Sequence, residues 1–129
     1  MAGHEGLDRV RRDGVDLVDW HAEMVNRLRA AYPDVRLWTS FKAYSGVLEV
    51  SALVVPSEQR GSGVGTRVMR ELIAEADRRG VPIALTPDAA FGGSKARLAR
   101  WYKGLGFRPN AGRARNFMTR ETLIRQPAP

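Results

Sequence analysis

The chain has 129 residues, of which 43% are hydrophobic and 27% charged, which indicates one globular domain and excludes two independent catalytic units. The absence of cysteine excludes disulfides, thiolate metal sites and a cysteine nucleophile, and two histidines are too few for most zinc sites or Ser-His-Asp triads. Since no apolar run is long enough to span a membrane and no apolar segment follows the N-terminal charges, we expect a cytoplasmic protein, and its net charge of +7 favours an anionic ligand.

The N-terminal part is predicted to contain a flexible segment and one helix. Residues 1–15 are polar, and we expect them to be flexible. From Asp16 to Pro33, apolar residues recur every three or four positions, which predicts a helix with one stripe, formed by Leu17, Trp20, His21, Met24, Leu28 and Ala31. Because His21 lies on this stripe, we interpret it as a residue at the edge of the core more readily than as a catalytic base.

Two strands joined by a tight turn are predicted next. Val35–Tyr44 alternates in the manner of a strand, and Ser45-Gly46 is a turn signal before the apolar run Val47–Val55, so we expect a β-hairpin. The second run is apolar enough to be covered on both faces, except that Glu49 and Ser51 fall on the same side of it by the period of two.

A βαβ unit is predicted after the hairpin. Apolar residues from Val64 to Ala76 form the stripe of a helix that ends at Gly80, and the short apolar run Val81–Thr86 follows. A strand, a helix and a strand in this order predict two parallel strands with a right-handed crossover.

The chain is predicted to close with one helix and one or two strands. The helix lies around Ser94–Gly104, and Phe107 with residues 116–124 supplies the strands. We therefore expect a single domain over residues 16–125, followed by a tail at 126–129.

The segment between the hairpin and the next helix indicates chemistry. It is Arg60-Gly-Ser-Gly-Val-Gly-Thr66, and its alternating glycines lie where a buried strand passes into a helix. The first N–H groups of a helix have no intrahelical partner, and glycine allows close approach, so this turn suits a phosphate. No G-x-x-x-x-G-K-[ST] is present, and Thr66 occupies the position where the dinucleotide fingerprint needs Gly or Ala. A glycine-rich turn without a ligand is the alternative.

Two motifs, one at this turn and one at the last helix, resemble those of a known family. Arg60-x-x-Gly63-x-Gly65 resembles the [Q/R]-x-x-G-x-[G/A] signature of the GNAT N-acetyltransferase superfamily, and Arg100-Trp-Tyr102-Lys-Gly-Leu-Gly106-Phe107 resembles its aromatic-Tyr-x-x-x-Gly-Phe motif. The segments PSEQRGSGVG and ALTPDAAFGG resemble those of small stand-alone members from bacteria and their phages. The resemblance implies an α/β (α+β) fold with a mixed central sheet and flanking helices, N-terminally short. It also implies acetyl-CoA-dependent N-acetyltransferase activity, for which we expect direct transfer to an amine in a ternary complex.

The resemblance implies a role for individual residues. Backbone amides of the turn would bind the pyrophosphate of acetyl-CoA, here at Arg60, Gly61, Ser62, Gly63, Val64, Gly65 and Thr66. The main chain of the preceding strand would pair with the pantetheine arm, here at Leu53, Val54 and Val55. Tyr102 would give a proton to the departing thiolate, with a core aromatic as its alternative role. Family members often have a cofactor-contacting asparagine where this chain has Ser94 and Lys95, and either can substitute; no metal is expected.

Glu49 is the candidate general base. An alkylamine has a pKa of about 10 and must lose a proton before it attacks a thioester. Glu49 shares the side of Ser51 on an otherwise apolar strand beside the implied cofactor, which suits this task. A glutamate that faces solvent or pairs with Lys42 across the hairpin is an equal alternative. A backbone N–H near Leu53 or Val54 would stabilise the oxyanion.

The C-terminal third carries most of the excess charge. Residues 95–125 contain nine Lys and Arg residues against Glu121 alone. This charge favours a polyanion, so a nucleic-acid-binding or nucleic-acid-modifying protein is the alternative function, and a solvated arginine-rich surface is the simplest interpretation. The expected partner is a small-molecule or peptide amine acceptor, and no membrane is expected. The sequence leaves open the acceptor, nucleic-acid binding and the choice between monomer and homodimer.

Overall fold

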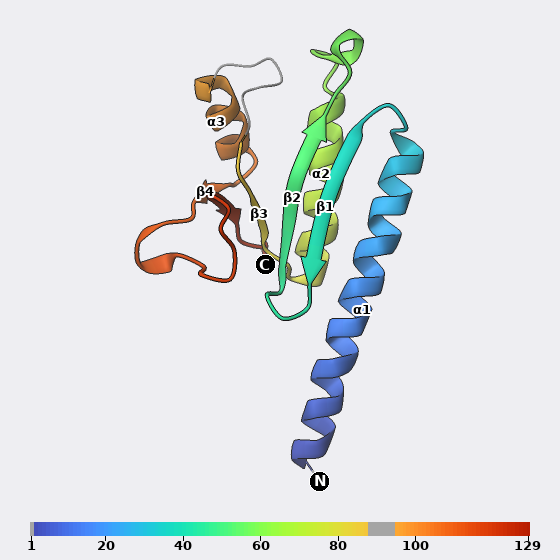
Figure 1. Cartoon of the computed structure of the whole chain (residues 1–129), viewed down its shortest axis with the longest axis vertical. Helices are drawn as coiled ribbons and strands as arrows, with labels where there is room; N and C mark the ends of the chain where they lie inside the picture. Colours follow the sequence, from blue (N-terminus) through green and yellow to red (C-terminus); the bar gives the residue numbers. More distant parts are fainter. Residues whose placement is uncertain (1, 88–94) are drawn as a thin grey trace.

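The computed structural model describes residues 2–87 and 95–129 as a mixed α/β fold around a five-stranded sheet (Figure 1). The strand order is β1-β2-β3-β5-β4. The elements are α1 (Ala2–Ala31), β1 (Arg36–Lys42), β2 (Val47–Val54), η1 (Ser57–Gln59), α2 (Val64–Arg79), β3 (Ile83–Leu85), α3 (Lys95–Gly104), β4 (Arg108–Pro109), η3 (Gly112–Ala114) and β5 (Leu123–Arg125). The predicted mixed central sheet with flanking helices is confirmed.

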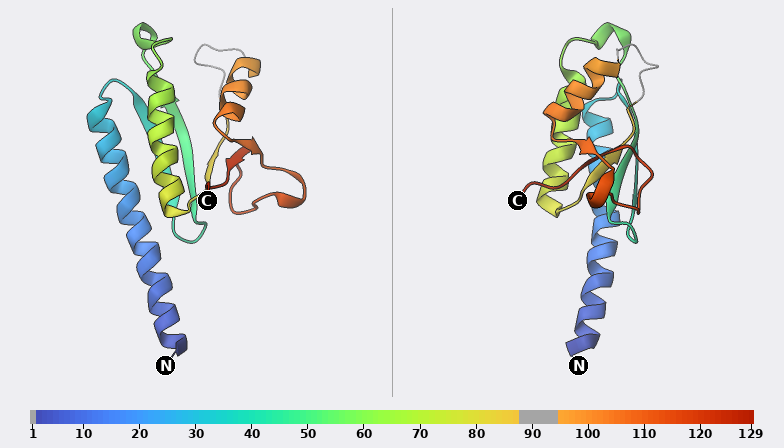
Figure 2. Two further views of the ribbon diagram at one scale, coloured as in Figure 1. Left: turned by 180° about the vertical axis from the view of Figure 1, so that it is seen from behind. Right: turned by 90° about the vertical axis from the view of Figure 1, so that its left-hand side faces the viewer.

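Helices α1 and α2 cover one face of the sheet and form the main core with it (Figure 2). The predicted stripe of α2 is confirmed, because its members are all buried: Val64, Val68, Met69, Leu72, Ile73 and Ala76. From α1, Trp20, Met24 and Leu28 pack into the same core. His21 is half-buried, and its Nε2 lies 2.7 Å from Thr39 Oγ1 in a hydrogen bond, which agrees with a position at the edge of the core.

Helix α1 begins at Ala2, not at Asp16 as predicted from the apolar stripe. It extends well past the end of the sheet (Figure 1). Extending an existing helix costs far less free energy than starting one, so a segment with a weak pattern can continue a helix that packing has already nucleated. The apolar stripe therefore marks the packed part of α1 and not its full length. Among the described helices, none is both long and apolar enough to cross a membrane.

Strand β2 lies between two partners but pairs with them over different lengths. It pairs antiparallel with β1 as far as Val54, opposite Arg36, which confirms the hairpin. It pairs in parallel with β3 only over Leu48–Val50, which confirms the βαβ unit. Beyond Val50, the two parallel strands separate, so the β3 side of residues 51–54 has no strand partner.

The register between β1 and β2 shifts at Ser51. Trp38 lies opposite Ala52, while the next residue, Thr39, lies opposite Val50, so Ser51 is an extra residue on β2. An extra residue of this kind is a β-bulge, which bends a strand and changes the side that its later residues face. Leu48 and Val50 belong to the core before the bulge, and Leu53 packs against it afterwards. The bulge thus lies where β2 and β3 part.

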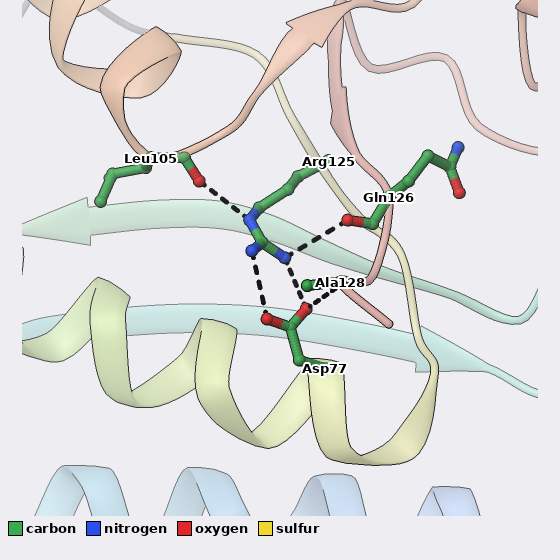
Figure 3. A network of polar contacts seen from close by, with 5 residues as sticks. All are labelled: Asp77, Leu105, Arg125, Gln126 and Ala128. Atoms are coloured by element: carbon green, nitrogen blue, oxygen red, sulfur yellow. Dashed lines mark hydrogen bonds and ion pairs between the residues drawn. The ribbon is translucent and has the colours of Figure 1, made fainter.

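The C-terminal third is tied to α2 by the network in Figure 3. Arg125 of β5 donates two hydrogen bonds to the Asp77 carboxylate, at 2.6 and 3.1 Å, and its Nε donates to the Leu105 carbonyl at 2.8 Å. The Ala128 N–H donates to the same carboxylate at 3.0 Å. Gly106 has φ +98°, and a Cβ at this residue would lie 3.0 Å from Arg125 Nε. The glycine of the second motif thus makes room for this guanidinium.

Candidate active site

A cleft of about 550 Å³ opens where β2 and β3 separate. Its walls are the second half of β2, the glycine-rich turn, the start of α2, the end of β3 and α3. The lining residues are Val50, Ser51, Ala52, Leu53, Val54, Val55, Gln59, Arg60, Gly61, Gly63, Val64, Gly65, Thr66, Leu85, Thr86, Arg97, Leu98, Trp101 and Tyr102. Most of the site residues predicted from the two sequence motifs therefore line this one cleft.

The strand wall of the cleft presents backbone as well as side chains. Because residues 51–54 pair with β1 alone, their main-chain groups on the other side can bind a ligand with amides of its own. Leu53 and Val55 are half-buried against the core, which fixes this wall in place. The predicted strand residues Leu53, Val54 and Val55 all line the cleft.

The glycine-rich turn shapes the other end of the cleft. Gly61 and Gly63 both have φ +83°, a conformation that favours glycine, and Gly63 is the N-cap of α2. A Cβ on Gly65 would lie 3.3 Å from Val55 Cγ2, closer than side chains normally pack. Since the Arg67 N–H is the first to bond back, to the Gly63 carbonyl, the N–H groups before it in α2 remain available to an anion.

Two further residues of the turn are held by hydrogen bonds. Arg60 lines the cleft, and its Nε donates to the Val55 carbonyl at 3.3 Å, so the cation stays next to the end of the strand. Ser62 is exposed and does not line the cleft. Its hydroxyl donates to the Gln59 carbonyl at 2.5 Å, which stiffens the turn. The turn therefore combines fixed N–H donors with a positive charge.

Tyr102 enters the cleft from α3. Its ring packs 4.8 Å from Trp101 and 5.6 Å from Phe107, measured between centroids, and burial raises the pKa of its phenol above the ordinary value. A phenol holds its proton at neutral pH even at its ordinary pKa, and burial favours the protonated form further, so the hydroxyl is available as a proton donor. Trp101 Nε1 donates a 3.0 Å hydrogen bond to Thr66 Oγ1, which joins α3 to the first turn of α2. The tyrosine is thus held relative to the glycine-rich turn.

Glu49 lies beside the cleft and does not line it. It is half-buried, opposite Ser40 in β1 and Ala84 in β3, and Thr119 Oγ1 donates a 3.1 Å hydrogen bond to its carboxylate. Among the described residues, no ion pair joins Glu49 to Lys42. The hydrogen bond from Thr119 could not be predicted from the sequence because it joins residues 70 positions apart.

Helix α3 contributes residues that the sequence analysis did not assign to the site. Arg97 and Leu98 line the cleft, one turn before Trp101 and Tyr102. Their spacing of four from these aromatic residues was the available signal, since such residues share a helix face. Lys95 is exposed at the first position of α3 and is not among the lining residues. Ser94 lies outside the described residues.

Comparison with known proteins agrees with both motifs. The profile of the Acetyltransferase (GNAT) family matches residues 16–107. The chain belongs to this family. This GNAT protein is therefore an acetyltransferase. No curated protein gives a significant match. Among solved structures, the chain is similar to Ard1 from Thermoplasma volcanium, with 16% identity, a TM-score of 0.48, and coverage of 81% of this chain and 78% of that chain.

Membership of the GNAT family implies acetyl-CoA as cosubstrate, and the cleft suits it. The glycine-rich turn offers N–H donors and Arg60 to phosphates, the open side of β2 offers backbone to the pantetheine amides, and the walls near Leu53 and Leu98 are apolar. Among the side chains of residues 16–87 and 95–129, no group of His, Asp and Glu is arranged to hold a metal ion.

Proposed function

We propose that this GNAT protein transfers the acetyl group of acetyl-CoA directly to an amine, with both substrates bound at once. The observation that best supports this is that the Tyr102 side chain, the glycine-rich turn and the unpaired side of β2 line one cleft. An enzyme that first took the acetyl group itself would need a nucleophile there. The chain has no cysteine, so the commonest acceptor of a thioester acyl group is absent from the sequence.

Tyr102 is proposed as the general acid. When bound, acetyl-CoA supplies an acetyl group activated as a thioester. Loss of the thiolate is easier if the sulfur receives a proton as the C–S bond breaks. Tyr102 suits this step because it lines the cleft, because a phenol is protonated at neutral pH, and because Trp101 and Phe107 pack against its ring.

Glu49 is proposed as the general base for the incoming ammonium. A charged alkylamine has no lone pair for attack, so one proton must leave before the C–N bond forms. Because Glu49 lies beside the cleft rather than in its lining, we propose that a water carries this proton to the carboxylate. The Thr119 hydroxyl holds the carboxylate in position at 3.1 Å.

The backbone of β2 is proposed to stabilise the oxyanion. Negative charge develops on the acetyl oxygen as the amine adds, and a fixed N–H donor lowers the energy of that charge. Leu53 and Val54 lie in the stretch of β2 that has no partner on the β3 side. One of their two N–H groups, the one that points away from β1, is the candidate, and it needs no rearrangement because β1 holds the strand from its other side.

Cofactor binding is the first test. Acetyl-CoA should raise the melting temperature as its concentration rises, because a ligand of the folded state stabilises by RT ln(1 + [L]/Kd), about 2.7 kcal/mol at a hundred times Kd. The absence of any shift at millimolar acetyl-CoA would contradict the proposal. A screen of thiol release against small amines, amino acids and peptides would then find the acceptor class.

Replacement of the acid is the second test. Tyr102→Phe should lower kcat by about 10²- to 10⁴-fold and leave the KM for acetyl-CoA nearly unchanged, because general acid catalysis acts in the transition state. Tyr44→Phe is the matched control, since Tyr44 is 72% exposed in the hairpin turn away from the cleft lining. Equal turnover in both variants would remove Tyr102 from the mechanism.

A further inference from the structure

The segment between β4 and β5 is a built loop that the proposed function does not use. Asn110, which is buried, precedes this loop and binds its middle and its far end: its Nδ2 donates to the carbonyls of Asn116 and Glu121, both at 3.2 Å. Its Oδ1 accepts the Asn116 N–H at 2.8 Å, and its own N–H donates to the Thr122 carbonyl at 2.8 Å. Asn110 thus fixes the conformation of residues 111–120, which we call the arginine loop.

The arginine loop presents charge and an aromatic ring to solvent. Phe117 is 79% exposed and Met118 is 51% exposed, although large apolar side chains usually lie inside. Its arginines are all exposed: Arg113, Arg115 and Arg120. In the described part of the chain, no carboxylate lies within ion-pair distance of them. The Arg115 guanidinium carbon lies 5.1 Å from the centroid of the Phe117 ring.

The charge of the surrounding sequence selects an anionic partner. Residues 89–120 contain no acidic residue at all. Arginine binds phosphate through two parallel hydrogen bonds, and an exposed ring offers a face on which a base can stack. Binding to a lipid surface requires a larger exposed apolar area than two side chains provide. Binding to an acidic protein requires positive charge and does not explain the exposed aromatic ring. The combination favours a nucleic acid whose bases are unpaired.

We propose that the arginine loop binds single-stranded nucleic acid. Arg113, Arg115 and Arg120 contact phosphates, and one base stacks on the face of Phe117 that Arg115 does not cover. The proposal depends on charge and shape alone, so it stands whether or not the chain acetylates an amine.

The loop also adjoins the cleft. Thr119, in the loop, donates to Glu49, and Glu121 at its end accepts a 2.6 Å hydrogen bond from Thr86 Oγ1, which lines the cleft. The arginine loop therefore lies beside Glu49, the proposed base, and beside the cleft wall at Thr86. In combination with the proposed acetyl transfer, this places an amine carried by the nucleic acid within reach.

Fluorescence anisotropy with a labelled single-stranded oligonucleotide of mixed sequence tests the proposal. The affinity should fall steeply with salt, because each phosphate neutralised on a single strand adds about −0.7 to the slope of log K against log salt. Replacing Arg113, Arg115 and Arg120 together by Gln should reduce that slope by about 2. Phe117→Ala should weaken binding roughly tenfold and leave the slope unchanged, because it removes stacking and no charge.

A charge-matched variant is the control. Replacing Arg36, Arg70 and Arg79 by Gln removes the same three charges from β1 and α2, where these residues are exposed. If this control loses as much affinity and slope as the loop variant, binding is non-specific and the proposal fails. It also fails if the oligonucleotide does not bind at low salt, or if Phe117→Ala binds normally.

Two further measurements separate the other outcomes. Vesicles of anionic phospholipid and an acidic peptide are tested under the same salt conditions, and tighter binding to either would overturn the assignment of the partner. The acetyl-CoA melting shift is measured on the loop variant, which should keep it. A chain that binds the oligonucleotide and shows no acetyl-CoA shift would refute the proposed acetyl transfer and leave this inference intact.

Discussion

The two parts of the molecule that form the cleft are stabilised by different kinds of contact. The part up to residue 87 contains nearly all of the buried apolar side chains, packed between α1, α2 and the sheet. Among the described residues 95–129, only Phe107 and Ile124 belong to that set. The other apolar side chains of the C-terminal part that touch the core are only partly buried: Trp101, Tyr102, Leu105 and Leu123. Polar contacts add to this weaker packing: Asp77 with Arg125, Thr66 with Trp101, Glu49 with Thr119, and Thr86 with Glu121.

This difference determines how each part should respond to change. Apolar packing is insensitive to pH and is lost only when the fold opens, whereas ionic and hydrogen-bonded contacts can weaken while the core stays intact. Tyr102 lies on α3, in the part with less buried apolar surface and more polar contacts, and the glycine-rich turn lies in the packed part. We therefore expect catalysis to fail under conditions in which the core and the cofactor turn are still folded.

The largest expected effect on stability comes from the packed part. Leu72→Ala removes a fully buried side chain of α2 and should lower the free energy of unfolding by about 2–5 kcal/mol. Urea denaturation followed by circular dichroism measures it. Arg70→Ala, on the exposed face of the same helix, should stay within about 0.5 kcal/mol of the parent. A small loss in Leu72→Ala would contradict the assignment of the core.

The next largest loss of stability is expected for Arg125→Gln, which should also lower turnover. Arg125→Gln removes the ionic hydrogen bonds to Asp77 and the bond to the Leu105 carbonyl, which should cost about 2 kcal/mol. Turnover should fall several-fold in fully folded protein, because Leu105 follows Tyr102 by one turn. Arg78→Gln, which breaks an exposed ion pair with Glu75, should cost less than about 1 kcal/mol and leave turnover unchanged.

Acid should weaken the same anchor. The hydrogen bonds from Arg125, opposed in part by burial, lower the pKa of Asp77 below its ordinary value, and the Ala128 N–H lowers it further. A depressed carboxyl pKa stabilises the fold above the pKa of the unfolded chain, and this contribution is lost as pH falls through the folded pKa. The stability difference between the parent and Asp77→Asn should be full at neutral pH and vanish in the acid range. A difference that is constant with pH would refute this.

The smallest effect tests the contact between the arginine loop and β2. Thr119→Val removes the hydroxyl that donates to Glu49 and should cost about 1 kcal/mol of stability. If Glu49 is the base, kcat should fall and its dependence on pH should change, while the KM for acetyl-CoA stays the same. Thr122→Val is the control, since its side chain is exposed. Identical pH profiles in both variants would show that Thr119 does not position the base.

Local patterns in the sequence predicted the parts of the fold that local physics determines. Helix α2 ends at Gly80, as predicted, because that residue has φ +69° and only glycine adopts this conformation readily. The hairpin turn at Ser45-Gly46 and the parallel pairing of β2 with β3 were predictable for similar reasons. The glycine-rich turn and Tyr102 were found because their motifs lie in short, continuous segments.

Contacts between distant segments were not predictable in the same way. The bulge at Ser51 is followed by the wholly apolar residues 52–55, where no alternation of polar and apolar residues marks a change of side. Asp77 and Arg125 each look like ordinary surface charges until the fold brings them together across 48 positions. Likewise, nothing in the sequence indicates that the Asn110 amide binds both Asn116 and Glu121.

The separation of β2 from β3 also bears on self-association. A strand with one unpaired side is normally a template for edge-to-edge growth of sheets, and proteins guard such edges with charges, prolines or covering segments. Residues 51–54 carry no charge, yet their open side lies in a cleft bordered by the glycine-rich turn and α3. A slender extended ligand fits between these walls and a whole sheet does not, so the fold keeps hydrogen-bonding backbone exposed for binding while shielding it from aggregation.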